Sequence, residues 1–121
     1  MSKASFQNWL GEACDIDLID PVPSAARTAT GNGGAFALGD RNQLRLTLAV
    51  TAASGTAPTL DVTVQHSPDG STWSTLGTFA QKTGVASERK IFSGCDRFLR
   101  CIWTIAGSSP SFTFSVTGEA V

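Results

Sequence analysis

Three segments of this chain alternate apolar and polar residues with a period of two, which brings every second side chain to one face of an extended strand. The segments are LRLTLAV (44–50), TLDVTVQHS (59–67) and SFTFSVTG (111–118). One apolar face and one mostly polar face are typical of antiparallel strands that cover a core on one side and meet water on the other. The pattern predicts an all-β fold, and no long helical pattern interrupts it.

A fourth segment, RFLRCIWTI (97–105), is apolar on both faces. Four residues form its first face and two form its second: Leu99, Cys101, Trp103 and Ile105, then Phe98 and Ile102. Two apolar faces suit a central strand that is covered on both sides, or a strand whose outer face lies at an interface.

Shorter strand candidates are AFAL (35–38), WSTLGTFA (73–80) and ERKIF (88–92). The turn signals LGDRN, ASGTAP, SPDG, KTG, SGCD and AGSSP separate the candidate strands. Short strands at such spacing indicate a single antiparallel β-sandwich, Ig-like or jelly-roll-like, over residues 35–121. A chain of 121 residues is also of ordinary length for one domain.

Residues 1–34 show little strand pattern. We interpret them as an extended N-terminal arm, in which the prolines of DPVPSAARTATGNGGA set an extended path and GNGG forms a flexible joint. Removing residues 1–34 should then leave the β-domain folded. The alternative interpretation, an ordinary first strand and loop packed on the domain, is equally open.

Composition excludes several classes of function. Only 16% of the residues are charged and the net charge is −1, so we expect no direct nucleic-acid partner. The chain has three cysteines, Cys14, Cys95 and Cys101, which are too few for a disulfide framework. No two of them have the CxxC spacing that is usual at a zinc site. We therefore expect a protein made in a reducing cytoplasm, without a signal peptide, a membrane-spanning segment or a zinc site.

The segment LDVTVQHSPDGSTWSTLG (60–77) holds the only histidine, His66, beside Ser67 and Asp69. A hydrolytic site would need the serine within reach of its base, but neighbouring residues of a strand point to opposite faces. SPDG is also a favourable β-turn sequence. We expect a structural hairpin here, and we assign no catalytic, cofactor-binding or metal-binding residues anywhere in the chain.

Aromatic and basic residues supply the candidates for partner binding. Phe6, Trp9 and Leu10 are expected to anchor the arm in a pocket of a partner. Arg97 and Arg100 are the basic residues of the otherwise apolar segment 97–105 and could pair with acids of a neighbouring subunit. Trp73 and Trp103 are expected in the core. The alternative is that Trp9, Trp73 and Trp103 are exposed and form a sugar-stacking platform.

The segments LGDRNQLRLTLAVTAASGTAPTLDVTVQHSPDGSTWSTLGTFAQKTG and FLRCIWTIAGSSPSFTFSVTGEAV resemble small proteins from the structural gene blocks of tailed bacteriophages and prophages, notably those of actinobacterial hosts. The resemblance spans roughly residues 38–121, and SGTAPTLDV, HSPDGSTW and SPSFTFSVTG carry most of it. It implies a virion structural protein, and the arm matches less clearly.

Together these observations suggest a non-enzymatic capsid decoration (cement) protein of the minor capsid type. It would be made in the host bacterial cytoplasm, bind the outer surface of the major capsid shell and stabilise it. Its partners would be the major capsid protein, copies of itself, or both, with no membrane partner. The alternatives are a tail tube or head–tail junction protein, and a glycan-binding module for host attachment.

Overall fold

The computed structural model describes residues 2–7, 13–39 and 41–120, with the backbone alone described for 2–7, 13–18 and 36. The described part forms one antiparallel sheet. Its strands are β1 (Ser2–Gln7), β2 (Ala13–Arg27), β3 (Gly31–Asn32), β4 (Phe36–Ala37), β5 (Gln43–Ser67), β6 (Ser74–Thr78), β7 (Ala86–Ser93) and β8 (Phe98–Ala120). Within these residues, no helix has the length and apolar character needed to cross a membrane.

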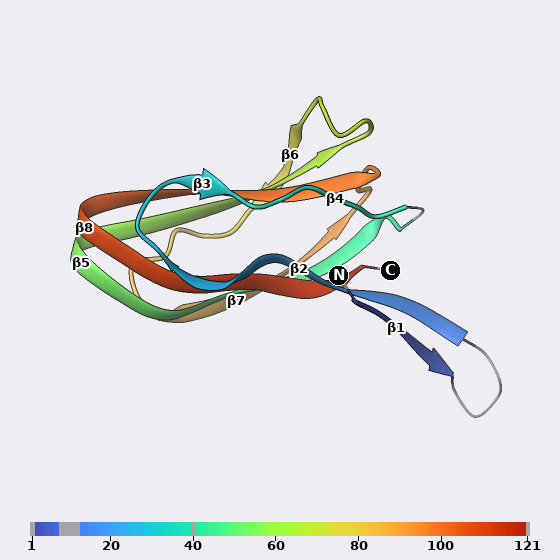
Figure 1. The fold of residues 1–121 in the computed structure, drawn as a ribbon, viewed down its shortest axis with the longest axis horizontal. Coiled ribbons are helices and arrows are strands. Elements are labelled where there is room, and N and C mark those ends of the chain that lie inside the picture. The colour runs from blue at the N-terminus through green and yellow to red at the C-terminus, as the bar shows by residue number, and fades with distance from the viewer. Residues whose placement is uncertain (1, 8–12, 40, 121) are drawn as a thin grey trace.

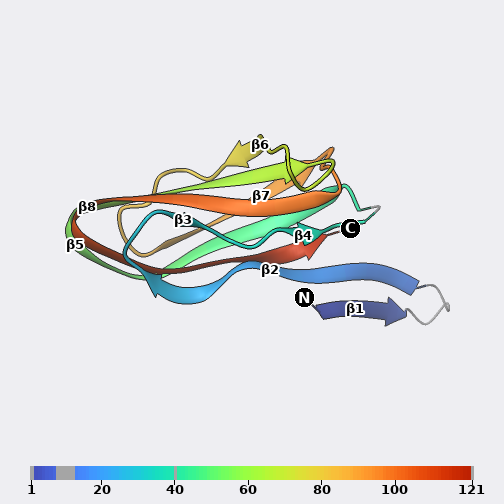
Figure 2. The ribbon, with the colours of Figure 1, turned by 45° about the horizontal axis from the view of Figure 1, so that its top comes forward.

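Two long strands organise the molecule. β5 has 25 residues and β8 has 23, and they pair from Leu44 opposite Ala120 to Ser67 opposite Phe98. Both strands bend midway, so the sheet folds over on itself into two facing layers (Figures 1 and 2). The all-β prediction is confirmed, and this folded sheet is compatible with the predicted sandwich.

We call the two layers A and B. Layer A contains β1, β2, the second half of β8, the first half of β5, and β7. Layer B contains β3, β4, the first half of β8, the second half of β5, and β6. Each long strand therefore contributes to both layers, and the bend between its halves joins one layer to the other.

The bends lie at two similar sequences, SGTAP (54–58) and AGSSP (106–110), which we predicted as turns between separate strands. That prediction is wrong, because pairing continues through both of them with bulges in its register. Gly55 and Gly107 have φ values of 110° and 123° there. A Cβ at Gly55 would lie 2.7 Å from the Ser109 carbonyl oxygen, and one at Gly107 would lie 2.8 Å from that of Ala57. Each bend therefore packs against the backbone of the other.

The core fills the space between the layers. Alternate residues of β5 and β8 from both halves are buried, as the period of two predicted. The buried apolar residues on these two strands are Leu44, Leu46, Leu48, Val50, Leu60, Val62, Val64, Leu99, Cys101, Trp103, Ile105, Phe112, Phe114, Val116 and Ala120. Fully burying one large aliphatic or aromatic side chain contributes roughly 1.5–3 kcal/mol, so this set dominates the stability of the fold.

Residues 13–34 belong to this sheet, which corrects the arm interpretation for that part of the chain. β2 pairs with β8 from Asp17 opposite Ala120 to Arg27 opposite Phe112, and Ile19 and Val22 are buried in the core. The alternative, a first strand packed on the domain, describes this segment.

GNGG is not a flexible joint in this structure. Gly31 and Asn32 form β3 opposite Trp103 and Ile102, and the Gly33 amide donates to the Cys101 carbonyl at 2.8 Å. A Cβ at Gly33 would lie 2.6 Å from the Pro21 carbonyl oxygen, so glycine is required by this close approach.

The part of the N-terminus that leaves the body is a hairpin. Among the described residues, β1 pairs with β2 alone, from Ser2 opposite Leu18 to Gln7 opposite Ala13. Since β2 meets β8 from Asp17 onward, most of this hairpin has no described strand on its other side. β1 and the start of β2 project beyond the two layers (Figure 1).

Candidate functional site

The segment around His66, Ser67 and Asp69 forms a hydrogen-bonded turn. Ser67 is fully buried, and its Oγ accepts hydrogen bonds from the amides of Asp69 (3.2 Å) and Gly70 (2.8 Å) and donates to Asp69 Oδ1 (2.9 Å). The Asp69 carboxylate accepts from the amides of Ser71 and Thr72 at 2.8 and 2.9 Å. These amide bonds, together with the Ser67 hydroxyl, lower the pKa of Asp69. The serine hydroxyl is therefore engaged with the turn and does not face the histidine.

His66 has a structural partner of its own. Its Nδ1 accepts a hydrogen bond from the Asp96 amide at 3.1 Å, and the Asp96 carboxylate lies 3.5 Å from the same atom. The residue pairs with Ser74 on β6 and with Leu99 on β8. The predicted hairpin is confirmed, and His66 ties it to the loop that precedes β8.

Trp103 lies in the core, as predicted. It is 8% exposed, its indole Nε1 donates to the Ala29 carbonyl at 3.1 Å, and its ring meets Phe114 edge-on at 5.5 Å. The Arg27 guanidinium lies 5.0 Å from the Trp103 ring centroid and 4.8 Å from that of Phe114. Trp103 therefore presents no free face on which a sugar could stack.

Trp73 does not belong to the core, so that prediction is wrong. It is half-buried on the surface, and the Arg100 guanidinium lies 4.4 Å from its ring centroid. Arg100 Nε also donates to Gln65 Oε1 at 2.7 Å. The residue follows the SPDG turn and lies just before β6, where the chain has not yet re-entered the sheet.

Of the other predicted binding residues, Arg97 and the backbone of Phe6 lie within the described part of the chain. Arg97 is exposed just before β8, and its carbonyl accepts a hydrogen bond from the Leu38 amide at 2.6 Å. The Phe6 backbone pairs with that of Cys14 in the projecting hairpin, whereas Trp9 and Leu10 lie outside the described residues. The roles of these residues as anchors stay predictions.

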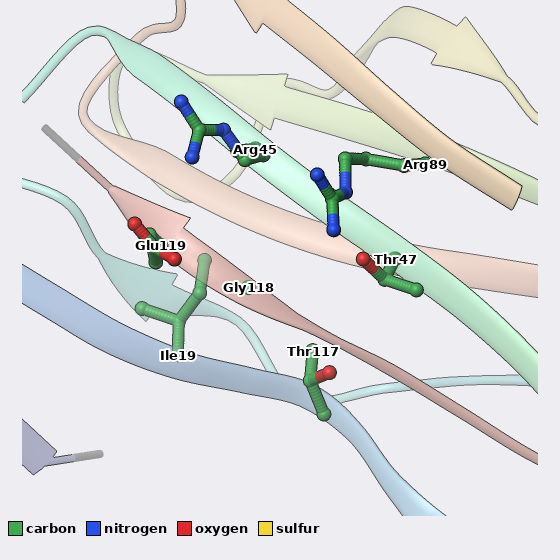
Figure 3. Close-up of a pocket in the computed structure, with 7 residues that line it drawn as sticks. All are labelled: Ile19, Arg45, Thr47, Arg89, Thr117, Gly118 and Glu119. Carbon is green, nitrogen blue, oxygen red and sulfur yellow. The ribbon is translucent and has the colours of Figure 1, made fainter.

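A surface hollow lined partly by charged side chains lies on the outer face of layer A. It has a volume of about 350 Å³. Its lining comes from β2, β5, β7 and β8: Ile19, Arg45, Thr47, Arg89, Thr117, Gly118 and Glu119 (Figure 3). We call it the layer A groove. A smaller hollow of about 60 Å³ adjoins it and shares Arg45 and Glu119, with Ile91 in its lining.

Strand register explains why these side chains meet. On β5, Arg45 and Thr47 alternate with the buried Leu44, Leu46 and Leu48, so they point to the outer face. Thr47 lies opposite Arg89 on one side and opposite Thr117 on the other. Gly118 has no room for a side chain, since a Cβ there would collide with the Arg45 carbonyl oxygen.

The groove has an excess of positive charge. In the strand register, Arg45 on β5 lies opposite Glu119 on β8 and opposite Ile91 on β7. The Ile91 side chain is 70% exposed. Within the described part of the chain, neither Arg45 nor Arg89 forms an ion pair. The lining thus holds two guanidiniums on adjacent strands and one carboxylate, that of Glu119, a charge arrangement that would favour an anionic partner.

Sequence reasoning did not identify this groove. Its residues come from four strands separated by up to about a hundred positions, and each alone is an ordinary solvent-facing residue. The only available signal was the alternation on LRLTLAV and ERKIF, which assigns Arg45, Thr47, Arg89 and Ile91 to outer positions but does not show that the two strands are neighbours.

Comparison with known proteins found similar folds but no similar sequence. No family model and no curated protein sequence matches the chain. A crystal structure of the SPBc2 prophage-derived protein YomS aligns with a TM-score of 0.50 and 13% identity, over 87% of this chain and 93% of that one. The structure of infectious bursal disease virus Gx strain aligns with a TM-score of 0.56 and 12% identity, over 99% of this chain and 36% of that one.

A third structure, the CBM36-1 domain of a multidomain xylanase from the hindgut metagenome of Trinervitermes trinervoides, has a TM-score of 0.47 and 8% identity. It aligns over 86% of this chain and 95% of the domain. At the identities of YomS and the virus chain, the likeness is one of fold. The fold of this chain is thus one that a prophage-derived protein and a virus chain also adopt.

Proposed function

We propose that this chain is a non-enzymatic virion structural protein of a tailed bacteriophage, and that it decorates and stabilises the outer surface of the capsid shell. The observation that carries the proposal is the likeness of the fold to a prophage-derived protein and to a chain of a virus. The phage resemblance inferred from the sequence points the same way, although no family model matches the chain.

The geometry supports a binding role. The folded sheet is a rigid platform, with most of its large apolar side chains buried between the layers. A hairpin projects from one end of layer A, and the outer face of the same layer carries the groove. A shell presents the same partner surface many times, so weak contacts from a hairpin and a sheet face add up over one particle.

Copy number in purified particles of the source phage tests the proposal. Quantitative mass spectrometry should find this chain in hundreds of copies per particle, and electron cryo-microscopy should show its density on the outside of the shell. Absence from purified particles, or presence only in the tail, would contradict capsid decoration.

A position in the tail tube or head–tail junction is the second candidate, and the two edges of layer A favour it. Within the part of the chain that the structure describes, β1 pairs with β2 alone and β7 with β5 alone, so the described layer ends in an unpaired strand edge on both sides. Free edges allow one subunit to extend the sheet of the next around a ring. About a dozen copies or fewer per particle, located at the vertex or tail, would favour this candidate.

A further inference from the structure

We propose that the layer A groove binds an acidic peptide segment of a partner protein, with a carboxylate held by Arg45 and Arg89. The inference deepens the proposed function, on which it rests for the identity of the partner as a neighbouring virion protein. Its physical basis is the charge and shape of the groove.

Charge is the first step. Arg89 is directly opposite Thr47, two residues from Arg45, so the two arginines are diagonal neighbours on adjacent strands. Neither has an ion-pair partner among the residues that the structure describes. Figure 3 shows both guanidinium groups over the same side of the sheet, with Thr47 and Thr117 beside them. A carboxylate between the guanidiniums would relieve their mutual repulsion and accept charge-assisted hydrogen bonds from both.

Apolar surface is the second step. Ile91 is one of two large hydrophobic side chains that are strongly exposed in the described part of the chain, and it lies opposite Arg45. It lines the small hollow next to the groove. An aliphatic side chain of the partner could cover Ile91 while the neighbouring acid reaches the arginines, which specifies a peptide better than a free anion.

The shape of the site is the third step. Residues from four strands line about 350 Å³ of open space, with Gly118 forming part of the lining and no side chain to fill it. The threonine hydroxyls can donate to or accept from a peptide backbone. The site is large enough for a short segment and is too open to enclose a small molecule.

Peptide titration of the purified full-length chain, followed by NMR of backbone amides, tests the inference. The probe is the capped peptide acetyl-Leu-Asp-Leu-Asp-amide, and its neutral match is acetyl-Leu-Asn-Leu-Asn-amide. We expect the acidic peptide to give saturable shifts at Thr47, Arg89 and Thr117, and the neutral one to bind at least about tenfold more weakly.

Single variants locate the binding. Arg45→Gln and Arg89→Gln should each weaken binding of the acidic peptide about tenfold. Lys90→Gln removes one positive charge from the opposite face of β7, where the Lys90 ammonium bonds to the Thr78 carbonyl, and should leave the affinity unchanged. Since both groove arginines are exposed, the variants should keep the melting temperature of the parent.

Four results of the titration would overturn the inference. They are no saturable shift of the amide signals, equal affinity for the two peptides, equal affinity of all three variants for the acidic peptide, and the same shifts with inorganic phosphate alone.

Sedimentation of the protein without peptide provides one further test. Self-association that Arg45→Gln and Arg89→Gln abolish would assign the groove to a second copy instead. None of these outcomes bears on copy number in the particle, so the inference and the proposed function fail separately.

Discussion

Among single residues of the described chain, some charged groups form bonds within the fold and others remain available to a binding partner. Lys82 is 9% exposed, and its Nζ lies 2.6 Å from Glu88 Oε1, which also accepts from the Ala80 amide at 2.9 Å. Lys90 Nζ donates to the Thr78 carbonyl at 2.7 Å. These bonds link edge strand β7 to the opposite layer, whereas Arg45 and Arg89 on the outer face have no such function.

The free energy of unfolding should decrease at acidic pH because of Glu88. The hydrogen bond from Lys82 is the main cause that lowers the pKa of Glu88 below its usual 4.5. A carboxyl with a lower pKa when folded contributes stability that is complete above its unfolded pKa and is lost as pH falls through the folded value. Urea unfolding at a series of pH values from about 7 to about 3 should show this fall in the free energy of unfolding. In Glu88→Gln the fall should be smaller by the contribution of Glu88.

At about pH 7, Glu88→Gln should also cost about 1–3 kcal/mol, because it leaves the Lys82 ammonium without its carboxylate. Glu119→Gln is the matched control, since Glu119 forms no ion pair among the described residues. An unchanged acid slope in Glu88→Gln would show that other carboxyls produce it.

The thiols of Cys95 and Cys101 should be inert in the folded protein. Burial raises the pKa of Cys101 to about 12, and burial with the nearby Asp96 charge raises that of Cys95 to about 11. Since the thiolate is the reactive form, iodoacetamide at about pH 8 should modify neither residue until the chain is unfolded. Peptide mass spectrometry measures this, and native modification of Cys101 at the unfolded rate would contradict the described packing.

At the scale of elements, the two bends decide the architecture. Without them β5 and β8 would form one long flat ribbon with an apolar face in water. The bends turn that ribbon so that its two apolar halves cover each other. Both sequences combine a glycine with a proline three residues later, Gly55 with Pro58 and Gly107 with Pro110.

Gly55→Ala and Gly107→Ala should therefore each destabilise the fold by at least about 2 kcal/mol, through unfavourable φ and a clash with the opposite bend. Gly34→Ala and Gly84→Ala are matched controls, because a Cβ at either position meets nothing within 4 Å. They should change the free energy of unfolding by no more than about 0.5 kcal/mol. Chemical denaturation compares the four, and equal effects would contradict the role of the bends.

At the scale of the whole molecule, the N-terminal region has two parts with different consequences for folding. Removing residues 1–12 deletes β1, which pairs with β2 alone, so the melting temperature should change little. Removing residues 1–34 also deletes β2 and β3 and uncovers the core around Ile19 and Val22, at a cost of at least about 3 kcal/mol. The expectation that the β-domain folds without residues 1–34 is thereby revised.

Circular dichroism melts of the two truncated chains measure the difference. Particle binding of the chain that lacks residues 1–12 then tests the projecting hairpin without loss of the fold. A cooperative, unshifted melt after removal of residues 1–34 would show that β2 is dispensable, and would support the original division at residue 34.

Local patterns predicted the strand character of residues 44–50, 59–67, 97–105 and 111–118, and the buried face of the three alternating segments among them, because alternation is a local property that survives any arrangement of the sheet. They also predicted the SPDG hairpin, whose turn is made by adjacent residues. That SGTAP and AGSSP are bends follows from tertiary contacts, since each glycine is required by contact with the other bend about fifty residues away. The same holds for β2 and for the groove of Arg45 and Arg89, because pairing with a distant strand is a long-range interaction that no local pattern encodes.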